Sequence, residues 1–106
     1  MTDLEINKAL ALAIGHHRFD VRINALSGNL VVLDKSDYKW RIFDYHNWNV
    51  ISPIAERYNC FPFIGDGGGW DARVFVEHTR EWHYGDTPQK AIALAVIESV
   101  GKGPTA

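Results

Sequence analysis

Five histidines are the residues of this chain best suited to chemistry, because neutral imidazole is both a general base and a common metal ligand. The candidates for a metal site are His16, His17 and His46, and either Asp20 or Asp44 could complete it. No two histidines have the i, i+4 spacing that puts both ligands on one face of a zincin helix. We therefore predict solvated turn histidines, and we expect neither a metal nor another cofactor.

Two other features suggest catalysis or phosphate binding. Cys60 could act as a nucleophile beside a histidine base, but it follows a predicted helix, where a buried structural thiol is equally natural. The glycine-rich run 65–69 could cradle a phosphate only if a helix followed, with its N-terminal amides facing the anion. A strand-like run follows instead. We predict a mobile loop there, and a protein that is not an enzyme.

Aromatic and arginine side chains are the better candidates for binding. Tyr45 and Trp48 fall in a predicted turn, where a tryptophan has less reason to be buried than in a strand or helix. With Arg41 and Arg57 they could form a protein-contact hot spot or a platform on which a base stacks. The other tryptophans are expected in the core.

Length and composition limit the class of protein. The chain has 106 residues with 46% hydrophobic residues, which predicts one globular domain over residues 1–106. Its net charge of −2 provides no general attraction to nucleic acid, so we expect none to bind. No apolar run reaches the roughly 18 residues of a membrane span, and the acidic start Thr2–Glu5 is unlike a signal peptide. We therefore expect a cytoplasmic protein that does not bind a membrane.

The most apolar segment is 86–100, and it predicts a core helix. Asp86 and Gln89 have capping-box spacing, and Thr87 followed by Pro88 is an alternative start. Its apolar surface beyond the main stripe consists of Ala91, Leu94 and Ala95. We predict a homodimer through this helix, with the alternative that the first helix covers the same surface within one chain.

Two further helices should position the candidate residues. Capping-box spacing starts one helix over 3–14, which Gly15 ends as a left-handed cap. Another helix ends near Tyr58, and its N-cap is either Asn47 or Ser52, the latter followed by Pro53 in the first turn.

Alternation of apolar and polar residues predicts the strands. Three lie at 19–24, 30–33 and 38–43 and form a meander, and two lie at 70–76 and 81–84. The segment 61–64 is apolar but contains Pro62, which predicts packed irregular chain. The order α-βββ-α-ββ-α indicates an α+β fold, with an antiparallel sheet of about five strands layered with three helices and a frayed tail at 101–106.

Three stretches, 4–8, 43–62 and 86–97, carry a resemblance to a known group of proteins. The clearest motifs are Pro53-Ile54-Ala55-Glu56-Arg57-Tyr58 and Thr87-Pro88-Gln89-Lys90-Ala91. They resemble small phage and prophage proteins of unknown function, namely NinX-like proteins and the phage "ABA sandwich" domain. The resemblance implies an α+β sandwich and a phage origin in a bacterial host. It implies no catalytic or binding residue.

Together these observations predict a non-enzymatic phage or prophage accessory protein that binds a host or phage protein. The alternative is a small-molecule binder for a nucleotide-like ligand, which a deep pocket lined by Trp48 and Arg41 would favour. The second alternative is a metal-dependent enzyme built on the histidines.

Overall fold

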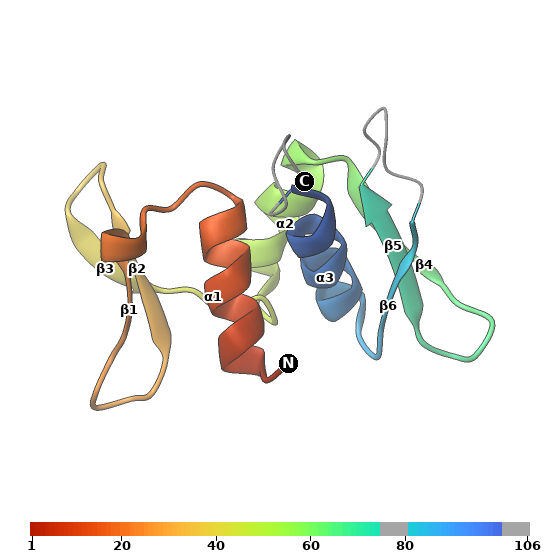
Figure 1. Ribbon diagram of the computed structural model, residues 1–106, viewed down its shortest axis with the longest axis horizontal. Helices are drawn as coiled ribbons and strands as arrows, with labels where there is room; N and C mark the ends of the chain where they lie inside the picture. Colours follow the sequence, from red (N-terminus) through yellow and green to blue (C-terminus); the bar gives the residue numbers. More distant parts are fainter. Residues whose placement is uncertain (75–80, 101–106) are drawn as a thin grey trace.

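The computed structural model describes residues 1–74 and 81–100, and it places three helices between two antiparallel sheets of three strands each (Figure 1). The helices are α1 (Asp3–Ala13), α2 (Trp48–Arg57) and α3 (Pro88–Val100). Sheet A contains β1 (Val21–Ile23), β2 (Leu30–Asp34) and β3 (Lys39–Ile42), and sheet B contains β4 (Cys60–Ile64), β5 (Trp70–Val74) and β6 (His83–Gly85). The α+β class is confirmed, but the single sheet of about five strands is wrong. The end of the strand predicted at 70–76, the turn predicted near 78–79 and the tail at 101–106 lie outside the described residues.

The first helix forms where its caps predict. The Thr2 N–H donates to Glu5 Oε1 (3.0 Å) and the Glu5 N–H donates to Thr2 Oγ1 (3.1 Å), which completes the capping box. Gly15 follows the helix with φ +110°, a conformation that residues with a Cβ rarely adopt.

The middle helix begins at its earlier candidate cap. The Asn47 side chain accepts the Asn49 N–H (2.9 Å), so the alternative start at Ser52 is wrong. Pro53 lies inside the helix on its exposed side, where the ring removes one backbone hydrogen bond. Burial of Ile51 and Ile54 on the opposite side offsets that loss.

Sheet A is the predicted meander with a shorter first strand. The His17 side chain caps a short 3₁₀ helix, η1 (Arg18–Asp20), by accepting the Phe19 N–H (3.2 Å). The strand therefore begins at Val21, and Phe19 lies outside it as an exposed side chain.

Sheet B contains a strand that the sequence analysis did not predict. Residues 60–64 form β4, which pairs with β5 in antiparallel register, Cys60 opposite Val74 and Ile64 opposite Trp70. The prediction of irregular chain was wrong because β4 is an edge strand. Pro62 is tolerated at an edge, since one side of such a strand needs no ladder hydrogen bonds.

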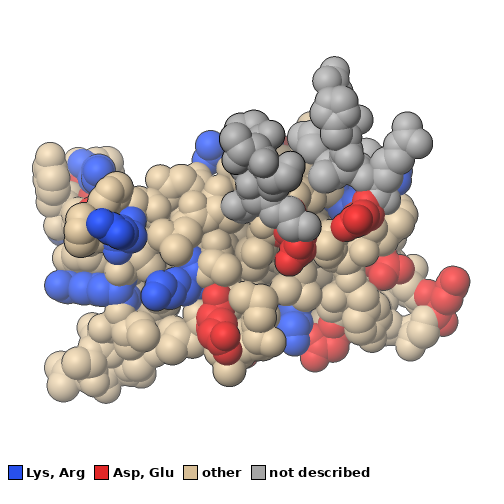
Figure 2. All heavy atoms as spheres, in the orientation of Figure 1, with Lys and Arg blue, Asp and Glu red and all other residues tan. Residues whose placement is uncertain are grey.

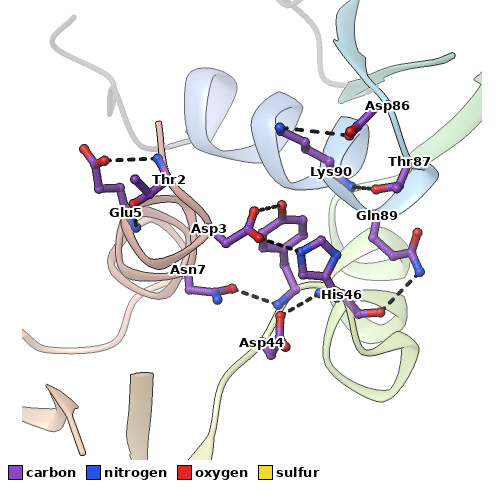
Figure 3. Close-up of polar contacts among 11 residues, drawn as sticks. Thr2, Asp3, Glu5, Asn7, Asp44, His46, Asp86, Thr87, Gln89 and Lys90 are labelled. Carbon is purple, nitrogen blue, oxygen red and sulfur yellow. Dashed lines mark hydrogen bonds and ion pairs between the residues drawn. The ribbon is translucent and has the colours of Figure 1, made fainter. Parts of the chain in front are cut away.

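Helix α3 occupies the centre of the core. It packs against all three strands of sheet B on one side and against α1 on another. Its start follows the alternative cap, because the Lys90 N–H donates to Thr87 Oγ1 (3.2 Å), while Gln89 Nε2 donates to the His46 carbonyl (3.2 Å) instead of closing a capping box (Figure 3). Its buried stripe includes Ile92 and Val96, both 0% exposed.

The predicted dimer surface on α3 is covered within the chain. Ala91 and Ala95 are both fully buried and Leu94 is half-buried, on a helix that packs against α1, α2 and all three strands of sheet B. Little of this apolar surface is exposed, so the homodimer through α3 stays a prediction that no exposed apolar patch on this helix supports.

We predict that Gly85→Ala destabilises the fold. A Cβ at residue 85 would lie 2.5 Å from the Ala91 backbone nitrogen, so β6 would have to move away from the first turn of α3. We expect a loss of about 1–3 kcal/mol in the free energy of unfolding, measured by urea denaturation.

Gly67→Ala is the matched control, because a Cβ at residue 67 meets nothing within 4 Å. Equal midpoints for the two variants would contradict the close packing of β6 on α3.

Candidate functional site

Tyr45, a predicted surface binding residue, is buried. It is 0% exposed, and its hydroxyl donates to Asp3 Oδ1 (2.5 Å) at the start of α1. Burial first, and then the bond to Asp3, raise the pKa of the Tyr45 hydroxyl far above its usual value. The Tyr45 N–H also donates to Oδ1 of the buried Asn7 (2.8 Å). The expected surface position of Tyr45 is therefore wrong, because the residue lies inside the core against α1.

The other three predicted binding residues lie apart from one another. Trp48 is 48% exposed at the start of α2. Arg57, at the end of that helix, donates to the Ile14 carbonyl (3.3 Å). Arg41 on β3 donates from Nε to Asp34 Oδ2 (3.2 Å) and also pairs with Asp37. These contacts tie both arginines to different parts of the framework, so they do not form one hot spot with Trp48.

A pocket of about 530 Å³ lies beside the connection between α1 and sheet A. Its polar lining comes from two histidines, two cations and two carboxylates, namely His16, His17, Lys35, Arg41, Asp20 and Asp34. Lys35 Nζ lies 3.2 Å from Asp20 Oδ2. Because His17 Nδ1 accepts the Phe19 N–H, the neutral ring carries its proton on Nε2. The pocket therefore offers hydrogen-bond donors and acceptors around an apolar wall that includes Val32.

The predicted metal candidates separate into two places. His16 and His17 line the pocket, whereas His46 Nε2 lies 3.1 Å from Asp3 Oδ2, beside the Tyr45 hydroxyl (Figure 3). Among the described residues no group of three or more His, Cys, Asp or Glu side chains could hold a metal ion. Asp44 instead accepts the His46 N–H (3.0 Å), and so shapes the turn before α2.

Cys60 is a structural thiol. It is 0% exposed in the core beneath α3, and burial raises the pKa of its thiol to about 12. At neutral pH the group is therefore a protonated thiol, which is a poor nucleophile.

The outer face of sheet B carries four exposed aromatic side chains. We call this the aromatic face, and its members are Phe61, Phe63, Trp82 and Tyr84, which are between 47% and 59% exposed. Alternate residues of the same strands, such as Cys60, Ala72 and Val74, are fully buried on the face that α3 covers. The strand period therefore directs these aromatic side chains away from the core.

Strand register arranges this face in rows across the sheet. Phe63 lies opposite Asp71, which lies opposite Tyr84. Above the central strand, the rings of Phe63 and Trp82 meet edge to face with centroids 5.7 Å apart, and the Arg73 guanidinium lies 4.7 Å from the centroid of Trp82. These contacts hold the rings of Phe63 and Trp82 in a defined arrangement.

The glycine run borders this face. A Cβ at Gly69 would lie 2.2 Å from Tyr84 Cε2, so the tyrosine ring occupies the space that a side chain would need. Gly69 is therefore a packing position beneath Tyr84.

The aromatic face was not predicted, although its signals are present in the sequence. Phe61 and Phe63 alternate, as do Trp82 and Tyr84, which is the strand period. Pro62, between the two phenylalanines, led to a prediction of irregular chain despite that alternation. Trp82 was assigned to the core because tryptophans are usually buried. Only the pairing of β4 and β6 with β5 brings the two pairs together.

No model of a protein family matches the chain, and a search of curated proteins finds no significant match. The resemblance to small phage proteins therefore stays a prediction. Within the described ranges, no helix combines the length and apolar character needed to cross a bilayer.

We predict that Asp3→Asn weakens the response of stability to acid. The Tyr45 hydroxyl first, and then His46, donate to Asp3 and lower the pKa of its carboxyl below the ordinary 3.8. Stabilisation of this kind is fully present above about pH 4 and is lost as the pH falls through the lowered pKa. Thermal melts at a series of pH values should therefore show a smaller loss in Tm below about pH 4 for the variant.

The control is Asp66→Asn in the loop between β4 and β5. If the Tm of Asp3→Asn falls below about pH 4 as much as the Tm of the unmodified protein does, the contacts of Asp3 are not a source of acid sensitivity.

Proposed function

We propose that this chain is a non-catalytic binding domain, that its partner is a protein, and that the aromatic face of sheet B makes the contact. The observation that carries the proposal is the cluster of four half-exposed aromatic residues on one face of one sheet. Protein interfaces are enriched in aromatic residues and arginine, which supply most of the binding energy at hot spots.

The arrangement of these rings supports a binding role beyond their exposure. Their backbones belong to or adjoin a paired sheet, the Phe63 ring contacts Trp82, and Arg73 lies over Trp82. Side chains that are already ordered lose little conformational entropy when a partner binds. The non-catalytic part of the proposal rests on Cys60, whose thiol is buried and protonated.

The proposed biological setting comes from the sequence resemblance. We place the protein among phage or prophage accessory proteins in the cytoplasm of a bacterial host, where its partner is a host or phage protein.

Variants on the aromatic face test this proposal. Tagged Phe61→Ser and Phe63→Ser proteins should lose a partner that the unmodified chain retains from phage-infected cells, as measured by quantitative mass spectrometry. Removing one hot-spot aromatic typically costs about 2 kcal/mol or more, which corresponds to about a thirtyfold loss of affinity.

Phe19→Ser is the matched control, because Phe19 is 73% exposed beside sheet A rather than on sheet B. Circular dichroism melts should show that all three variants fold. If the folded Phe61 and Phe63 variants retain every partner as well as Phe19→Ser does, the aromatic face is not the interface.

Small-molecule binding is a second candidate function, and the pocket beside sheet A favours it. Its volume of about 530 Å³ is within the usual range for ligand sites, and Arg41 is among its lining residues. Trp48, which was expected to line such a pocket with Arg41, is not among the lining residues. An anionic ligand group would have to compete in this pocket with Asp20, which pairs with Lys35, and with Asp34, which pairs with Arg41.

Thermal shift measurements with nucleoside monophosphates test this second function. A ligand present at about 100 times its Kd should stabilise the fold by about 2.7 kcal/mol and raise the Tm. Arg41→Gln should abolish the rise, whereas Arg22→Gln, on β1 and outside the lining, should preserve it. An unchanged Tm, or an equal rise in Arg41→Gln, would reject nucleotide binding at this pocket.

A further inference from the structure

Carboxylates surround the aromatic face. Asp71 lies between Phe63 and Tyr84 in the register of sheet B, Glu81 directly precedes Trp82, and Asp66 lies in the loop between β4 and β5. Asp66, Asp71 and Glu81 form no ion pair within the part of the chain that the structure describes. Their negative charge therefore remains available to a partner.

Charge is divided between the two ends of the molecule. In Figure 2, most lysine and arginine atoms lie over sheet A, whereas most aspartate and glutamate atoms lie over the helices and sheet B, where some basic atoms are also visible. The basic residues of the sheet A end are Arg18, Arg22, Lys35, Lys39 and Arg41. The described charged residues on or next to the aromatic face are Asp66, Asp71, Glu81 and Arg73, so carboxylates outnumber cations there.

The chemistry of the face favours cations. The faces of aromatic rings attract ammonium and guanidinium groups, and Arg73 already occupies such a position on Trp82. A second cation that contacts Phe63 or Tyr84 would also lie near the Asp71 carboxylate, because these three residues share one row of the sheet. The aromatic ring and the Asp71 carboxylate would then both attract the same cation.

We propose that the partner presents a segment rich in lysine and arginine to the aromatic face, an inference that rests on the proposed protein-binding function. Charge complementarity favours this occupant, because Asp66, Asp71 and Glu81 outnumber Arg73 and would repel an acidic segment or a nucleic-acid backbone. The aliphatic stems of lysine and arginine would pack on the exposed rings while their charged ends reach the carboxylates.

A peptide titration tests the charge preference. The full chain, labelled with ¹⁵N, is titrated with a short peptide that alternates lysine and glycine, and with a matched peptide that contains glutamate in place of lysine. The lysine peptide should shift the backbone amide resonances of sheet B, and the effect should weaken as salt is added. Shifts of equal size from the glutamate peptide, or lysine-peptide shifts elsewhere only, would overturn the proposal.

Isosteric variants test the carboxylates themselves. Asp71→Asn and Glu81→Gln should each weaken binding of the lysine peptide about two- to fivefold, as expected for a surface ion pair. Glu56→Gln, an exposed position on α2, should leave it unchanged. Equal affinities across all three folded variants would show that these carboxylates do not recognise the peptide.

Capture of the partner from infected cells distinguishes a failure of this inference from a failure of the proposed function. If capture from infected cells is lost in Phe63→Ser but survives Asp71→Asn combined with Glu81→Gln, the aromatic interface stands and the basic-segment proposal falls. If capture survives both, the proposed function falls as well. A dimer in sedimentation equilibrium that Phe63→Ser splits would make the occupant a second copy of this chain, and would also overturn the proposal.

Discussion

The fold depends on burying α3 from two sides. Sheet B covers one side of this helix and α1 covers another, and Ala91, Ala93 and Ala95 have no exposed surface. Small side chains at these positions allow backbones to approach closely, so the helix can be apolar around most of its circumference without remaining exposed. Because α3 covers the inner face of sheet B, the alternate residues of β4, β5 and β6 must face outward, and the aromatic face follows from that constraint.

Local signals predicted the helices and most of the strands. The capping box of Thr2 and Glu5, the left-handed Gly15 and the alternation in residues 30–33 each depend on neighbours within a few positions. The division into two sheets depends instead on contacts between distant segments, above all those of α1 with α3. Sequence periodicity shows which face of an element is apolar, but it does not show which other element covers that face.

The difference between local contacts and contacts of distant segments also explains the results for the predicted site. Tyr45 was expected in a surface turn, but it is tied to Asn7 by a hydrogen bond that spans 38 positions of the chain. Trp48 is 48% exposed, and Arg41 lines a pocket from which Trp48 is absent, although the small-molecule hypothesis named both residues. No local pattern could place Phe63 against Trp82, because their edge-to-face contact forms only after β4 and β6 have both paired with β5.

Pro62 has a consequence for the behaviour of this chain in a crowded solution. It lies in an edge strand between two exposed phenylalanines, in a segment that would otherwise be a template for intermolecular strand pairing. Proline has no N–H to donate to an incoming strand, so it interrupts a continuous ladder along this edge. Pro62, which obscured the strand in the sequence, is the type of residue that limits edge-to-edge aggregation where apolar side chains are exposed.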